Sequence, residues 1–224
     1  MSVWFGSIVR RLRSRAAACA VAMIGVLAVV APAPAAAEPA AVEPAVAAPA
    51  GTECREVTVP VTIAGQTGPI AGTLCVPPGA TTVQVLVHGL SYGRYYWDLP
   101  YQHETYSYVQ DAGQAGYATL AIDRLGIGES WHPASALVTY DSNANAVHQV
   151  VQAARGGDLG SQFEKVVLVG HSLGSVIGYL EAGTYQDVDA AVFTGGGHRA
   201  DNLERTAPVS NAAILDFIDR HVGT

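Results

Sequence analysis

The pentapeptide GHSLG at residues 170–174 places a serine between glycines, after an apolar run and before a segment that favours a helix. In a turn this sharp, side chains at 170 and 174 would collide, so both are glycine and the serine backbone is strained. The turn exposes the Ser172 hydroxyl and places the Leu173 N–H at a helix start, where unpaired donors favour an oxyanion. The pattern predicts acyl transfer with Ser172 as nucleophile. The alternative is a serine that merely occupies a glycine-rich turn.

Two further motifs follow predicted strands. His88-Gly89-Leu90 ends the first central strand, where the N–H of Leu90 would complete an oxyanion hole. The segment DRLGIGES, which begins at Asp123, follows the next strand, and its glycines permit a tight loop. Both segments are therefore expected beside Ser172.

In this order, LVHGL, AIDRLGIGES and LVGHSLGS resemble the motifs of the α/β-hydrolase superfamily, in its serine esterase or lipase-like branch. The resemblance covers roughly residues 56 to 195 and indicates the fold but no particular substrate. It implies Ser172 as nucleophile, Leu90 and Leu173 as main-chain oxyanion donors, and Asp123 as a residue that holds its loop. The serine argues against the branches that attack through aspartate, namely the dehalogenases and epoxide hydrolases.

A serine nucleophile needs a histidine base and a carboxylate that orients it. The resemblance implies that both follow the serine, the acid first. After VDAAVFTG, however, no convincing apolar run remains, so we expect the lid and the later strands to be missing. His198 in GGGHRADNL is the best candidate base. The competing interpretation places His198 in an ordinary loop and leaves the base absent.

The acid stays unassigned. Asp201 follows His198 too closely for the usual geometry, whereas Asp187 and Asp189 precede the sixth strand and should lie at the wrong end of the sheet. His171 is expected to pack beneath the site, and His88 to hold its loop. The remaining histidines of the domain have no motif: His103, His132, His148 and His221.

The apolar runs predict an α/β fold with a mostly parallel sheet, an N-terminal antiparallel hairpin and flanking helices. REVTVPVTI and IAGTLCV form the hairpin; VQVLVHG, YATLAID, KVVLVGHS and VDAAVFTG are the later strands. Helices are expected in ETYSYVQDAGQAG, in LGSVIGYLEAG, and in DSNANAVHQVVQAARGG with a cap at Asp141 or Ser142 and a stop at Gly156. A terminal helix begins near Pro208 and Ser210, with one apolar face: Ala212, Ile214, Leu215, Phe217 and Ile218.

Residues 1–37 have the features of a secretory signal. Four arginines precede the apolar run 16–30, and small residues follow it, with cleavage near Ala37. A retained membrane anchor is the alternative, but the run is shorter than the roughly 20 residues that span a bilayer. Residues 38–52 are an Ala/Pro-rich linker, and 53–224 are the hydrolase domain. We expect a secreted protein, extracellular or periplasmic, with no stable membrane anchor after cleavage.

The full chain carries a formal net charge of −7, and loss of the basic leader makes the mature chain more negative. Nucleic acid and anionic membranes are therefore not expected as partners. Cys54 and Cys75 are an even pair in an exported chain, which favours one disulfide over two buried thiols.

The residues favour a small-molecule ester as substrate and provide no pattern for a cofactor or a metal ion. Four aromatic residues either wall an acyl pocket or are ordinary core and surface aromatics of a long loop: Tyr92, Tyr95, Tyr96 and Trp97. The alternative function is a catalytically silent fold that at most binds small apolar ligands.

Overall fold

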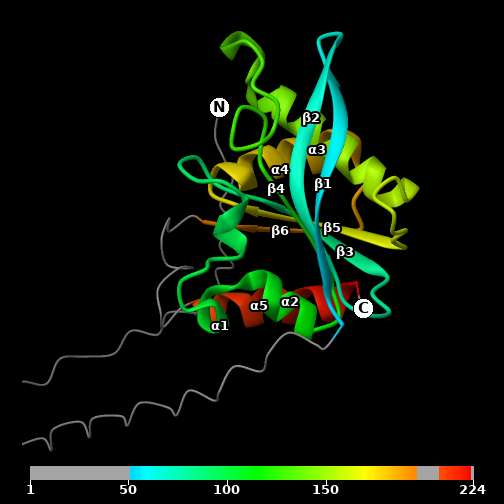
Figure 1. The fold of residues 1–224 in the computed structure, drawn as a ribbon, viewed down its shortest axis with the longest axis vertical. Coiled ribbons are helices and arrows are strands. Elements are labelled where there is room, and N and C mark those ends of the chain that lie inside the picture. Colours follow the sequence, from blue (N-terminus) through cyan, green and yellow to red (C-terminus); the bar gives the residue numbers. More distant parts are fainter. Residues whose placement is uncertain (1–50, 196–206, 223–224) are drawn as a thin grey trace, which may run out of the picture. The chain divides into compact units, whose positions relative to one another are not determined.

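The computed structural model describes residues 51–195 and 207–222, in which six strands form one sheet: β1 Glu53–Ile63, β2 Gln66–Val76, β3 Thr82–Val87, β4 Ala118–Ile122, β5 Lys165–His171 and β6 Ala190–Thr194. Their order is β1-β2-β4-β3-β5-β6 (Figure 1). Strands β4, β3, β5 and β6 are parallel, whereas β2 pairs antiparallel with both β1 and β4. The predicted fold class, a mostly parallel sheet with an antiparallel start, is confirmed.

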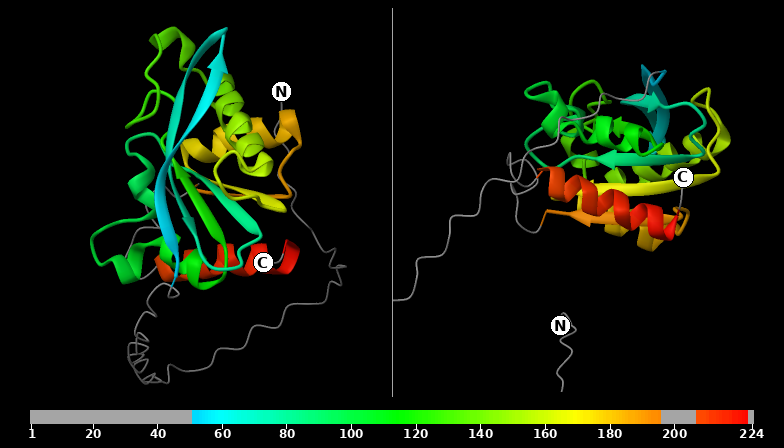
Figure 2. Two further views of the ribbon diagram at one scale, coloured as in Figure 1. Left: turned by 45° about the vertical axis from the view of Figure 1, so that its right-hand side comes forward. Right: turned by 90° about the horizontal axis from the view of Figure 1, so that it is seen from below.

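Helices cover both faces of this sheet (Figures 1 and 2). They are α1 His103–Tyr106, α2 Tyr108–Gln114, α3 Tyr140–Gly156, α4 Leu173–Tyr185 and α5 Ala207–His221, with short 3₁₀ turns at Arg94–Trp97 and Ser135–Leu137. One core cluster packs α3 and α4 on the sheet, and a second packs α2 and α5 on the opposite face. The central strands are buried on both sides, which explains why their sequences lack polar alternation.

The β1–β2 hairpin is tighter than its sequence suggested. Its loop is only Ala64 and Gly65, both with positive φ (50° and 76°), so β2 begins inside the glycine-rich segment expected to be the turn. Positive φ at both loop residues matches the twist of the flanking strands. At the other end of the hairpin, Cys54 pairs with Cys75 across the strands, and the two form a disulfide.

Two helix predictions need correction. The segment expected to form one helix over 104–116 divides at Ser107, because its hydroxyl caps α2 by accepting the N–H of Gln110 at 2.9 Å. Helix α3 is capped by Thr139, which exchanges hydrogen bonds with Ser142, rather than by Asp141 or Ser142. Its last residue is Gly156, the predicted stop, and Gly157 (φ 81°) is its C-cap.

The terminal helix forms as predicted, but its apolar face is narrower. Ile214 and Ile218 are buried in the second core cluster, whereas Ala212 and Phe217 are exposed. Among the described residues, no helix combines the length and apolarity needed to cross a bilayer. The predicted signal segment and all but the last two residues of the predicted linker lie outside the described residues.

Candidate active site

Ser172 occupies the sharp connection between β5 and α4. Its backbone has φ 53° and ψ −114°, a combination that L-residues rarely adopt. The connection is held by Ser172 itself, whose N–H donates to the Thr194 carbonyl at 3.0 Å, and by Ser175, whose hydroxyl contacts the carbonyls of Gly170 and Thr194 at 2.9 and 2.6 Å. The end of β6 therefore supports the strained serine.

The glycines of this turn are required by space. A Cβ on Gly170 would lie 2.6 Å from the Gly174 carbonyl oxygen, so the clash at this position is with the backbone of residue 174 and not, as the sequence predicted, with its side chain. A Cβ on Gly174 would overlap the carbonyl of Val87 at the end of β3. Gly195 has φ 103°, and a Cβ there would lie 2.6 Å from the Ser172 nitrogen. Three backbone segments thus meet at the serine without side chains between them.

A cavity of about 540 Å³ opens at Ser172. Its lining includes the predicted oxyanion residues Leu90 and Leu173 as well as apolar side chains from α4 and β6: Val176, Tyr179 and Phe193. No histidine or carboxylate contributes to this lining within residues 51–195 and 207–222. The cavity therefore suits an uncharged group and brings Ser172, Leu90 and Leu173 to one place.

The loop that carries Leu90 is hydrogen-bonded by a residue to which the sequence analysis assigned no role. Buried Arg124 donates to the carbonyls of Gly89 at 2.9 Å and Leu90 at 3.4 Å. A Cβ on Gly89 would lie 3.2 Å from the Cβ of Ser172, so this loop passes directly beside the serine. Arg124 directly follows Asp123 in the DRLGIGES motif. This position beside the loop-holding aspartate is the feature of the sequence that could have pointed to it.

His88 completes the support, as expected of a loop-holding residue. Its Nδ1–H donates to the Gly89 carbonyl at 2.8 Å, and its Nε2 accepts the main-chain N–H of Arg124 at 3.2 Å. Burial, with a smaller contribution from the Arg124 guanidinium, lowers the pKa of His88 to about 4. The imidazole is therefore neutral at physiological pH and its tautomer is fixed by these two bonds.

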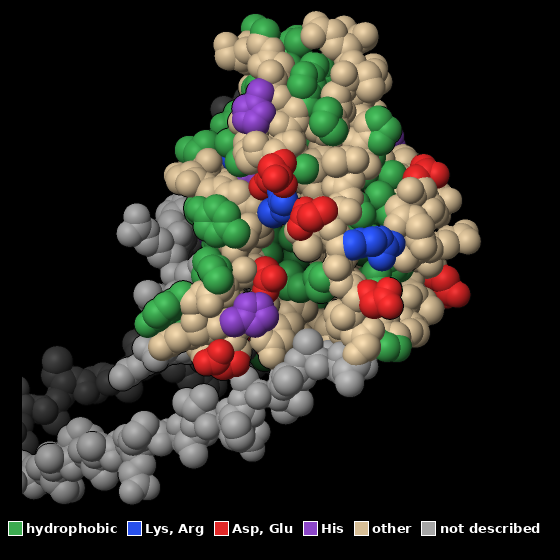
Figure 3. Space-filling model, in the orientation of Figure 1, with side chains coloured by type: hydrophobic (Ala, Val, Ile, Leu, Met, Phe, Trp, Pro, Cys, Tyr) green, Lys and Arg blue, Asp and Glu red, His purple; other side chains and the backbone are tan. Residues whose placement is uncertain are grey.

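Asp123 holds its loop, also as expected. The buried carboxylate accepts the main-chain N–H groups of Arg94 at 2.8 Å and Glu129 at 3.2 Å, and it forms an ion pair with the Arg94 guanidinium. Arg94 also pairs with Glu56 and Glu129 at the surface. The face drawn in Figure 3 shows basic side chains beside acidic ones. Asp123 therefore has a structural role, because its carboxylate is fully used in holding this loop.

His171 is buried, and its Nδ1 lies 3.0 Å from the Thr194 hydroxyl. Its ring stacks on Tyr96 at 4.7 Å, and Tyr96 in turn stacks on Tyr92. Tyr95 is exposed and Trp97 is buried against Tyr108. None of the four aromatics of this loop lines the cavity at Ser172, but Tyr92 and Tyr95 line a second cavity of about 710 Å³ that also borders Leu90.

The candidate acids before β6 lie at the wrong end of the sheet, as predicted. The Asp189 N–H donates to the Val166 carbonyl, and the Val166 N–H donates to the Asp189 carboxylate at 2.8 Å, at the opposite end of β5 from Ser172. Asp187 belongs to the same loop and contacts His148. His198 and Asp201 lie outside the described residues.

Comparison with known proteins identifies the fold. A sequence profile described as "Alpha/beta hydrolase family" matches residues 84–223. Among solved structures, DcsB in complex with its substrate analogue has a TM-score of 0.52 at 21% identity, over 63% of this chain and 45% of that one. An esterase of Pyrococcus furiosus has a TM-score of 0.51 at 13% identity, over 75% of this chain and 60% of that one.

A second crystal form of that esterase has a TM-score of 0.50 at 14% identity, over 62% of this chain and 50% of that one. The chain therefore spans about half the length of these solved structures. No curated protein matches its sequence. At such low identity, the structural similarity indicates the fold alone.

Proposed function

Because this chain belongs to the alpha/beta hydrolase family, we propose that it is a secreted serine hydrolase that cleaves a carboxylic ester through an acyl-enzyme on Ser172. The observation that supports this most directly is the strained, positive-φ backbone of Ser172 at the turn from β5 into α4, where the residue lines a cavity. A strained conformation that the surroundings stabilise this closely is characteristic of a functional position.

In the proposed reaction, the Ser172 oxygen attacks the ester carbonyl while a histidine takes the hydroxyl proton. The N–H groups of Leu173 and Leu90 donate to the oxyanion; Leu173 is the first residue of α4, so its N–H has no acceptor within the helix. The tetrahedral intermediate expels the alcohol, which takes the proton from the histidine. Water, deprotonated by the same histidine, then releases the acid and regenerates Ser172.

His198 is the base we propose. Gly195 lies against the Ser172 backbone, and chain connectivity limits the Cα of residue 198 to roughly 11 Å from the Cα of residue 195. No other histidine competes for the role on the described residues: His88 and His171 are both buried and engaged in hydrogen bonds, and none lines the cavity.

The cavity favours an uncharged acyl group of small or medium size. Its lining includes the apolar side chains of Leu90, Val176 and Phe193, and the chain's net negative charge disfavours anionic substrates. The similar Pyrococcus furiosus protein is named an esterase, which agrees with an ester substrate here.

The test is covalent labelling of the full chain with a fluorophosphonate probe, with the labelled fraction measured over time by intact mass spectrometry. We expect rapid, stoichiometric labelling of the natural chain, none in Ser172→Ala, and a rate at least about 10³-fold lower in His198→Ala. His132→Ala is the matched control, since His132 is exposed on a loop, and it should label at the natural rate.

Two results would contradict parts of this proposal. Full-rate labelling of His198→Ala would reject His198 as base and leave Ser172 as nucleophile. A chain that is folded by circular dichroism but resists labelling would reject the enzyme and support the alternative, a silent fold whose apolar cavity binds small ligands.

A further inference from the structure

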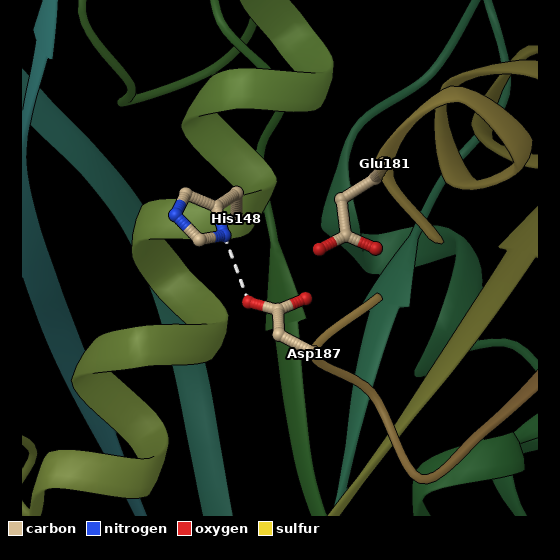
Figure 4. Close-up of side chains that lie close together, drawn as sticks. All are labelled: His148, Glu181 and Asp187. Atoms are coloured by element: carbon tan, nitrogen blue, oxygen red, sulfur yellow. Dashed lines mark hydrogen bonds and ion pairs between the residues drawn. The ribbon is translucent and has the colours of Figure 1, made fainter. Parts of the chain in front are cut away.

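A second cluster of reactive side chains lies at the opposite end of the sheet from Ser172. His148 comes from α3, Glu181 from α4, and Asp187 from the loop between α4 and β6 (Figure 4). Glu181 lies nine residues beyond Ser172 in the sequence, roughly 13 Å along the axis of α4. The proposed reaction uses none of these residues.

Glu181 is the unusual member of the cluster. It has no exposed surface, and neither of its carboxylate oxygens has a hydrogen-bond partner among the described residues. Figure 4 shows its carboxylate pointing toward Asp187. Burial, followed by the hydrogen bond that a protonated Glu181 would donate to Asp187 and by repulsion between the two carboxylates, raises the pKa of Glu181 to about 8. A buried carboxylate without partners is costly unless it is neutralised or binds a cation.

Asp187 also has a free acceptor, because only one of its two carboxylate oxygens is hydrogen-bonded within the described residues. One oxygen of Asp187, Oδ2, accepts from His148 Nδ1 at 2.7 Å and from the Gln152 amide at 2.5 Å. The second oxygen, Oδ1, is buried and has no partner on the described part of the chain. The imidazole is held by stacking on Tyr185, with ring centroids 3.9 Å apart and planes at 10°. The three side chains are therefore positioned before any ligand arrives.

The geometry points to a binding site for a divalent first-row transition metal ion, with Zn²⁺ as the best-matched ion, formed by His148, Glu181 and Asp187. One ligand atom from each residue lies within 4.8 Å of the other two. A zinc ion about 2.1 Å from each donor would separate the donors by roughly 3–4 Å, so only small side-chain movements are needed.

The donor set selects among metals. An imidazole nitrogen suits zinc and its first-row neighbours, whereas Ca²⁺ and Mg²⁺ prefer oxygen ligands alone. To bind, His148 must present the Nδ1 lone pair, so the imidazole proton moves to Nε2 and the hydrogen bond to Asp187 is replaced by the metal. Water completes the coordination shell. The ion would enter from the side of His148 and Asp187, whose side chains are 26% and 15% exposed.

Such an ion would link α3, α4 and the loop that leads into β6. The sequence predicted no metal ion, because the three residues come from separate elements and have no recognisable spacing. The competing explanation is a metal-free pair in which a protonated Glu181 donates to Asp187.

The test uses the full chain without an added histidine tag, stripped with a chelator and titrated with Zn²⁺ by calorimetry. We expect one equivalent to bind and to raise the unfolding temperature, and the affinity to fall at least about 100-fold in Glu181→Gln. Glutamine conserves size and can still donate to Asp187, so this variant keeps the competing pair intact. The matched control is His103→Asn, which removes an exposed imidazole that contacts a single carboxylate, that of Asp98 at 2.6 Å.

X-ray absorption at the zinc edge provides a readout that needs no variant. The proposal requires a shell of one imidazole nitrogen with oxygen donors. Absence of binding by the natural chain would overturn it, as would a shell without imidazole or an affinity unchanged in both Glu181→Gln and His148→Ala. Because the cluster lies away from Ser172, Glu181→Gln should label with fluorophosphonate at the natural rate, which keeps this test separate from that of the proposed function.

Discussion

Arg124 shows how one buried side chain can position the reactive part of a site without touching the substrate. Its guanidinium bonds the carbonyls of Gly89 and Leu90, and this orients the peptide whose N–H is proposed to stabilise the oxyanion. Misplacing such a donor reduces the rate of acyl transfer rather than substrate binding.

Replacement of Arg124 by methionine should therefore lower the rate of fluorophosphonate labelling about 10- to 100-fold. If an ester substrate is found, kcat should fall while KM stays within about threefold. Arg55→Met is the matched control, because Arg55 also donates to a main-chain carbonyl, that of Leu159 at 2.5 Å, but away from the serine. Equal rates in the two variants would refute a positioning role for Arg124.

His88 makes the stability of the fold depend on pH. Its pKa is about 4 in the folded state and near 6.5 when the chain is unfolded. Between these values the unfolded chain binds the additional proton, so the contribution of His88 is complete above about pH 6.5 and is lost as pH falls toward 4. The lost contribution is of order 3 kcal/mol.

Urea unfolding of the natural chain and of His88→Asn at pH 7.5 and pH 5 tests this. Asparagine removes the titrating group, so we expect the difference in unfolding free energy between the two chains to shrink on acidification. Taking the difference cancels the titration of other groups, such as Glu181 and Asp111, whose raised pKa values have the opposite effect. A difference that is constant with pH would contradict the neutral, buried state of His88.

At the scale of elements, the close approach of α4 to the end of β3 depends on Gly174. A Cβ there would overlap the Val87 carbonyl and lie 2.8 Å from that of His88, both of which are backbone atoms that cannot move aside. Gly174→Ala should therefore destabilise the chain by about 3 kcal/mol or more. Thermal and urea unfolding will measure this.

The same helix provides the control. Gly183 lies in α4 with nothing within 4 Å of its added Cβ, so Gly183→Ala should stabilise the chain by about 0.5–1 kcal/mol. If Gly174→Ala is as stable as the natural chain, the turn at Ser172 does not require the packing described above.

The elements and the serine turn could be predicted from the sequence because their signals are local. The GHSLG pentapeptide, the buried apolar runs and the terminal helix each specify their conformation within a few residues. Arg124 and Glu181 could not be recognised, because their roles arise from contacts with residues that are distant along the chain. Helix boundaries were misplaced at Thr139 and Ser107, where hydroxyl caps compete with the apolar periodicity.

At the scale of the whole molecule, the disulfide holds the first residues of the fold on the sheet. Cys54 and Cys75 are separated by 21 residues, and they lie opposite each other in the β1–β2 pair. Closing a loop of this length in the unfolded chain stabilises the folded one by about 3 kcal/mol in the chain-entropy description.

The double variant Cys54→Ser/Cys75→Ser should therefore lower the free energy of unfolding by about 2–3 kcal/mol, measured by urea denaturation at one pH. Reduction of the natural chain should have the same effect, and an unchanged midpoint would show that the hairpin needs no cross-link.

A disulfide stabilises the fold only where it can form, so the pairing of Cys54 with Cys75 bears on the secretory leader proposed for residues 1–37. We predict that a bacterial host which makes the whole chain exports it, cleaves it near residue 37 and oxidises Cys54 and Cys75 outside the cytoplasm. N-terminal sequencing and intact mass of the periplasmic fraction will check all three points.

Replacing the four leader arginines (Arg10, Arg11, Arg13 and Arg15) with glutamine should retain the precursor in the cell with reduced thiols, because the basic segment directs insertion of the apolar run. A natural chain found uncleaved and reduced in the cytoplasm would reject secretion. The proposed hydrolase would then have to fold without its cross-link, with the stability of the Cys54→Ser/Cys75→Ser variant.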